Sequence, residues 1–147
     1  MYLLDTNYCS QTIIGNPTAL RALSQHQNSG VSTCAIVEGE LIDMAARSQR
    51  RAENLALIQR FLQGIYIHPI DDRVAETYGQ LKASLFHQFA PKEKSKRRGT
   101  TLQNLGFSDN DLWIAATAIS HNLTLVSSDR DFQRIQQVTP LALENWL

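Results

Sequence analysis

Short apolar runs that alternate with helical patterns constrain the fold of this 147-residue chain more than any other feature. The runs are Tyr2–Leu4, Val31–Cys34, Ile65–Ile67, Thr124–Ser127 and a last one near 141–143. Apolar runs of this length, bounded by polar or turn-forming residues, indicate buried strands. Strands that alternate with helices form right-handed βαβ units. The sequence therefore predicts an α/β fold with a mostly parallel sheet of four to five strands.

The helical segments are expected to turn one apolar face toward this sheet. A helix that opens at Pro17 carries Leu20 and Leu23 on one face. The segment after Cys34 carries apolar residues at spacings that suit one face of a helix, namely Ile36, Val37, Leu41, Ile42 and Met44. Further helices are predicted over 51–62, from Asp71 or Asp72 to about residue 85, over 111–120 and near Phe132.

One polar, basic stretch, from about residue 89 to 107, does not follow the pattern. It contains a proline and two glycines, so we predict a long loop or lid near 90–107. Five of its residues are basic, within seven positions (Lys92, Lys94, Lys96, Arg97, Arg98). The segment is either a surface that binds phosphates or a solvated loop that keeps the protein soluble.

The chain has the length of one domain, and we expect a single domain over residues 1–147. Its net charge is zero and 43% of its residues are apolar, as in ordinary globular proteins. No apolar stretch approaches the roughly 20 residues that cross a bilayer, and no signal peptide is recognisable at the start. Two cysteines provide no disulfide framework, so the expected location is the cytoplasm.

Acidic residues stand where this fold would bring them together. Asp5 and Asp129 follow the ends of predicted strands, at the edge where open parallel sheets bind their ligands. Asp111 begins a helix and is either a ligand or a plain helix cap, and Asp129 is either a ligand or a turn residue. Glu40 lies in the helix after the second strand. Two-residue spacing sends Glu38 and Glu40 to different faces, so only one of them can point into the site; we favour Glu40.

Four carboxylates at one edge repel one another unless a cation lies among them. Oxygen ligands select Mg²⁺ or Mn²⁺ over zinc, and the four histidines form no zinc pattern. One or two such ions can activate a water against a phosphodiester, which is nuclease chemistry. A phospho-aspartate mechanism at Asp5 competes, although its motif wants an acid where Asn7 stands. Asn7 and Ser127 are expected either to support the carboxylates or to form local turn bonds.

With these residues identified, the chain resembles the PIN-domain ribonucleases, and among them the VapC toxins of bacterial type II toxin–antitoxin systems. The resemblance covers essentially the whole length and rests on four fragments in order: Leu4-Asp5-Thr6-Asn7, Gly39-Glu40-Leu41, Asp111 to Ala116, and Ser127 to Phe132. The basic segment is longer than the short connection of compact members.

The resemblance implies a central parallel sheet with helices on both faces and an endoribonuclease that depends on Mg²⁺ or Mn²⁺. It implies an acidic site of Asp5, Glu40, Asp111 and Asp129, with Asn7 and Ser127 close by. Asp5 and Asp111 would be the firmest metal ligands, while Glu40 and Asp129 act partly through waters. It further implies a homodimer, an RNA substrate and a neutralising VapB-type antitoxin.

Two other functions remain open at this point. One is a non-catalytic PIN-like module that binds RNA or a protein without cutting. The other is a metal-dependent phosphatase, which would release phosphate from small phosphomonoesters.

Overall fold

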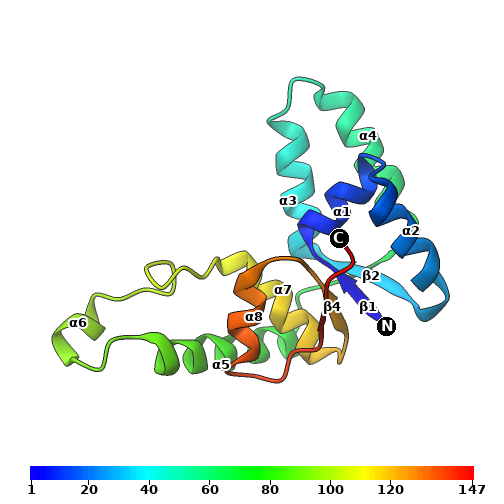
Figure 1. The fold of residues 1–147 in the computed structure, drawn as a ribbon. Coiled ribbons are helices and arrows are strands. Elements are labelled where there is room, and N and C mark those ends of the chain that lie inside the picture. The colour runs from blue at the N-terminus through cyan, green and yellow to red at the C-terminus, as the bar shows by residue number, and fades with distance from the viewer.

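The computed structural model describes residues 1–147 and contains five short strands and eight α-helices (Figure 1). In chain order the elements are β1 (Tyr2–Leu4), α1 (Thr6–Ile13), α2 (Pro17–His26), a 3-10 turn (Gln27–Ser29), β2 (Val31–Cys34), α3 (Ala35–Ala46), α4 (Arg51–Leu62), β3 (Tyr66–His68), α5 (Asp72–Phe89), α6 (Lys94–Arg98), α7 (Asp109–Ser120), β4 (Thr124–Val126), α8 (Arg130–Gln136) and β5 (Leu143–Glu144).

All five strands are parallel, in the order β3-β2-β1-β4-β5, which confirms the predicted sheet. From β1 the chain builds outward to β2 and β3, and then returns to place β4 on the other side of β1. The strand order therefore reverses between β1 and β4. In open α/β sheets this switch point, at the carboxyl ends of the strands, is where ligands bind.

Helices cover the sheet in two groups (Figure 1). Helices α1 to α4 form one group, and α5, α7 and α8 form the other. The paired helices α3 and α4 extend from the sheet in one direction, while α5 with α6 forms an arm in another. The strands lie in the core between the groups, where Leu3, Leu4 and Leu125 have no exposed surface. None of the helices combines the length and apolar character that spanning a bilayer requires.

Polar caps explain where several helices begin. Asn16 accepts hydrogen bonds from the backbone N–H groups of Thr18 (2.9 Å) and Ala19 (3.3 Å), and Pro17 occupies the first turn of α2. Asp71 rather than Asp72 caps α5, because its carboxylate accepts from the Val74 N–H at 2.9 Å. These side chains satisfy backbone donors that have no partner within the helix.

The stretch near 90–107, where a long loop or lid is predicted, is mostly irregular. Helix α6 lies inside it, and its return segment packs on the body through Leu102 and Phe107, both buried. Arg134 holds this return: its guanidinium lies 4.0 Å from the Phe107 ring centre and donates to the Leu105 carbonyl oxygen at 2.7 Å. Apolar anchors separated by polar residues do not show the helical period, so the sequence reads as irregular.

Smaller corrections concern faces and boundaries. Leu20, Ile42 and Met44 are 45%, 42% and 48% exposed, so they do not belong to the buried faces of their helices. Alanines take their places in the core, since Ala19 and Ala45 are buried. The last strand begins at Leu143, two residues later than expected.

Candidate active site

Four predicted acids line one hollow of about 410 Å³ at the switch point between β1 and β4. Asp5 follows β1, Glu40 comes from α3, Asp111 from the first turn of α7 and Asp129 from the residue before α8. The remaining lining residues are Thr6, Asn7, Ser10, Met44, Ile114, Ser128 and Phe132. Residues separated by more than 120 positions therefore meet in one place, because parallel strands end at the same edge.

Asp5 is the most deeply placed of these acids, with 4% of its surface exposed. It caps α1, and its Oδ1 accepts from the Tyr8 N–H at 2.7 Å. Burial raises the pKa of Asp5, and the carboxylates of Asp129 and Glu40 raise it further, while hydrogen bonds from Ser127 and the Tyr8 N–H oppose the shift. The aspartate is thus a rigid helix cap and a desolvated carboxylate at once.

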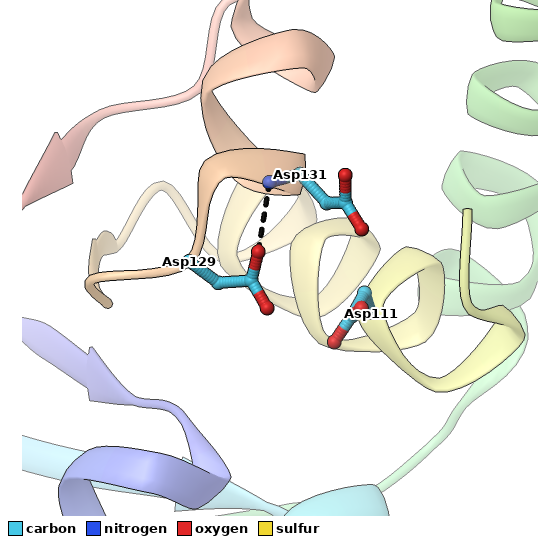
Figure 2. A group of neighbouring side chains, drawn as sticks. All are labelled: Asp111, Asp129 and Asp131. Carbon is cyan, nitrogen blue, oxygen red and sulfur yellow. Dashed lines mark hydrogen bonds between the residues drawn. The ribbon is translucent and has the colours of Figure 1, made fainter. Parts of the chain in front are cut away.

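Three aspartates form a close acidic group, and two of them, Asp111 and Asp129, line the hollow. One carboxylate oxygen each from Asp111, Asp129 and Asp131 lies within 4.8 Å of the others, and Figure 2 shows the side chains converging from α7 and the start of α8. Asp129 also caps α8 by accepting from the Asp131 N–H at 2.9 Å. Asp131 was not predicted as a site residue, although it stands inside the Ser127–Phe132 fragment.

Burial and the charges of nearby carboxylates both disfavour the ionised form of Asp111. The pKa of Asp111 rises from 3.8 to about 7, first through burial and then through the charges of Asp129, Glu40, Asp131 and Asp5. Only one cation contacts the three aspartates, since Arg134 lies 3.2 Å from Oδ1 of Asp131. Without a cation, the ionised form of these carboxylates is unfavourable, and a bound cation would remove that electrostatic cost.

Glu40, and not Glu38, is the glutamate that joins this hollow. Thr6 Oγ1 donates to one of its carboxylate oxygens and Asn110 Nδ2 donates to the other at 2.7 Å. Glu38 lines a separate hollow on the other side of α3, together with Gln59 and Ile67. Thr6 and Asn110 were not singled out from the sequence, because a hydroxyl and an amide beside an acid carry no distinctive pattern.

The two expected supporting residues differ in what they contact. Ser127 is buried; its oxygen accepts from the Asp129 N–H at 3.0 Å, and its hydroxyl acts to lower the pKa of Asp5. It therefore forms a local turn and also supports a carboxylate. Asn7 is exposed and donates to Ser128 Oγ at 3.3 Å rather than to an acid.

The donor set fits a hard divalent cation. Every ionisable group that lines the hollow is a carboxylate, and no histidine or cysteine lines it. The histidines lie elsewhere, for example His68 against His121. Oxygen donors of this kind are those that Mg²⁺ and Mn²⁺ prefer.

A parallel sheet with strand order 3-2-1-4-5 and acids at its switch point defines the class of protein. The PIN domain model matches residues 2–138, and the chain belongs to the PIN-domain family. It is 30% identical to "Ribonuclease VapC2" of Rickettsia felis over 99% of this chain and 98% of that protein. It is also 30% identical to "tRNA(fMet)-specific endonuclease VapC" of Shigella flexneri, over 99% and 97% of the two chains.

Among solved structures, the fold is similar to VapBC2 from Rickettsia felis bound to a DNA fragment from their promoter. The TM-score is 0.79 with 28% identity, over 99% of this chain and 98% of that one. The predicted α/β fold and the family resemblance are confirmed.

Proposed function

We propose that this protein is an endoribonuclease that depends on Mg²⁺ or Mn²⁺ and acts as the toxin of a VapBC-type pair. The observation that carries the proposal is the hollow in which Asp5, Glu40, Asp111 and Asp129 meet without a lining cation. The matching relatives are named ribonucleases and endonucleases, and they align over nearly their full length. Cleavage of RNA phosphodiester bonds is the reaction that both lines of reasoning support.

Asp5, Asp111, Asp129 and Asp131 are the residues that would hold the ion. When bound, a divalent cation supplies an activated water and neutralises charge that develops on the phosphodiester. The protein's own part is to hold the carboxylates in place. The Tyr8 N–H fixes Asp5, while Thr6 and Asn110 occupy both oxygens of Glu40. These two bonds hold Glu40 at the edge of the site, where its charge acts on the other carboxylates.

Asp111 gives the site a proton to release. With a pKa of about 7, it is partly protonated at neutral pH and must ionise before it can ligate a cation. We therefore expect cation affinity to rise as the pH increases through about 7 and to level off only above it.

The proposed protein partner is a VapB-type antitoxin, since solved structures similar to this chain include VapBC complexes. Carboxylates that lack a cation attract one, so we propose that an arginine or lysine of the antitoxin enters the hollow and competes with the metal. Complex formation that leaves Mn²⁺ binding unchanged would contradict this. Homodimerisation and a cytoplasmic location stay predictions.

The test is RNA cleavage by the purified protein and by Asp5→Asn, each with Mg²⁺, Mn²⁺ or EDTA. Suitable substrates are total RNA and tRNA, including tRNA(fMet), the substrate in the name of the Shigella relative. Cleavage by the unmodified protein alone, and only with metal, is expected. Activity that survives both EDTA and Asp5→Asn would overturn the proposal.

Two other results would assign another function. RNA binding that is insensitive to metal, without product, would indicate a binding module. Release of phosphate from small phosphomonoesters would indicate a phosphatase.

A further inference from the structure

A second hollow of about 590 Å³ lies directly beside the acidic one, along α3. The two hollows share three lining residues, Thr6, Glu40 and Met44. Six other residues complete the second hollow: Ala35, Ile36, Gly39, Asp43, Arg47 and Asn110. Glu40 lines both hollows, and Thr6 holds one of its carboxylate oxygens while Asn110 holds the other. The two hollows therefore adjoin at this glutamate.

Gly39 is the unexpected residue of this hollow. It lies in the interior of α3, where glycine is the least favourable residue apart from proline. Its φ is not positive, and a Cβ built on it would meet no atom within 4 Å. Neither backbone conformation nor packing within the protein accounts for it. Its effect is to leave a strip of bare helix backbone beside the acidic site, open to an approaching molecule.

The charges in the second hollow exclude one kind of occupant. Its carboxylates are Glu40 and Asp43, and its only cation, Arg47, already pairs with Asp43 at 2.6 Å. The hollow is therefore acidic overall and repels a phosphate group. Its other features suit a flat neutral ring: apolar surface from Ile36 and Met44, and the amide of Asn110, which keeps an oxygen and one N–H free beside Glu40.

We infer that this second hollow is the subsite for the base of a nucleotide adjacent to the scissile phosphate. The inference rests on the proposed ribonuclease function, and it identifies the part of the site that would give the enzyme its sequence preference. Single-stranded RNA is recognised through splayed bases that contact side-chain surfaces and hydrogen-bond along their edges. Gly39 supplies the space for the ring, and Asn110 reads its edge while it holds Glu40. The base subsite and the acidic site are thereby coupled through one carboxylate.

The test substitutes Gly39 with leucine, whose side chain would occupy the open space beside this position, and with alanine as the matched control. Both residues are better helix formers than glycine, and the space beside Gly39 is open, so both variants should unfold at or above the temperature of the unmodified protein. The substrate is a random-sequence single-stranded RNA pool, whose cut ends are sequenced. Mn²⁺ binding is measured by calorimetry in parallel.

Gly39→Leu is expected to raise KM for the pool at least tenfold and to remove the base preference at one position flanking the cut. Mn²⁺ affinity should be unchanged, and Gly39→Ala should keep both KM and the preference. Asn110→Ala, at an exposed position, should change the preference at the same flanking position. A merely structural role for Gly39 would lower the unfolding temperature of both variants and leave the preference unchanged.

Several results would overturn the inference. If Gly39→Leu cuts the pool with unchanged KM and preference, the hollow does not bind a base while the ribonuclease function stands. If Gly39→Leu instead escapes inhibition by the antitoxin while it cuts normally, the hollow belongs to that partner. If the unmodified protein cuts no RNA with either metal, the proposed function fails and the inference fails with it.

Discussion

Replacement of Asp111 by asparagine is expected to stabilise the metal-free protein at pH 8, although it should abolish RNA cleavage. In the folded protein, burial and four neighbouring carboxylates raise the pKa of Asp111 from 3.8 to about 7. At pH 8 the unmodified protein therefore carries an ionised group that its surroundings disfavour. Asparagine has nearly the same shape and no charge, so it removes that cost.

The magnitude follows from the pKa shift. One pKa unit corresponds to about 1.4 kcal/mol, so the shift to about 7 sets an upper limit of about 4 kcal/mol. Asp111 is only partly buried, and solvent screening reduces the expected gain to about 2 kcal/mol. For a domain of this size, the unfolding temperature should rise by about 4 to 8 °C.

The dependence on pH is a second signature. Between the ordinary pKa of 3.8 and about 7, the folded protein binds more protons at Asp111 than the unfolded chain does. The stability of the unmodified protein therefore falls as pH rises through this range. The advantage of Asp111→Asn should be small near pH 4.5 and complete by pH 8.

The assay is urea and thermal unfolding in EDTA at pH 4.5 and pH 8, with Asp109→Asn as the control. Both aspartates lie in the first turn of α7, so both substitutions lose the same interaction with the helix dipole. Asp109 bonds favourably to Tyr78 and Lys82, which lower its pKa, so its replacement should not stabilise. The reasoning would be refuted if Asp111→Asn were no more stable than the Asp109→Asn control. It would also be refuted if Asp111→Asn gained the same stability at both pH values.

Three further outcomes are expected. Alanine at the four basic positions of α6 (Lys94, Lys96, Arg97, Arg98) should weaken RNA binding. Anisotropy titrations should also show that the slope of log affinity against log salt falls by up to about 3. An unchanged slope would leave the segment with a solubilising role only. Arg134→Met should lower the free energy of unfolding by about 2 kcal/mol in urea, because the side chain loses its contacts with the Leu105 carbonyl, Asp131 and the face of Phe107. An equal loss at an exposed arginine such as Arg51 would contradict this. Burial and His121 lower the pKa of His68, so its protonation should reduce the free energy of unfolding as the pH falls below about 6.5. His68→Gln should flatten that part of the stability profile against pH.

Much of the fold was predictable because it depends on local patterns. The first four apolar runs became β1 to β4 within a residue or two. Helices α2, α3, α4, α5 and α7 formed near the positions that their periodicity predicted, whereas no such periodicity predicted α1 or α6. The wrong predictions concern helix faces whose burial depends on contacts with another part of the chain. Met44 has the spacing of a core residue, yet it lines the two hollows, since only packing determines which side of α3 is covered.

The acidic site shows the same division. Asp5 and Asp129 were predictable, because an aspartate that ends a parallel strand must lie at the ligand edge of the sheet. The choice between Glu38 and Glu40 required the rotation of α3 about its axis. Asp131 was missed because its approach to Asp111 depends on how α8 packs against α7, which no local spacing specifies.

The sequence by itself determined the alternation of strands and helices, the parallel sheet and the acids at the strand ends, because each follows from backbone geometry and residue period over a few positions. Only the tertiary structure decided which carboxylates come within 4.8 Å, which glutamate Thr6 and Asn110 hold, and that a bare stretch of α3 opens beside them. These features depend on contacts between residues far apart in the chain. The interactions that produce these features form only when the helices pack together.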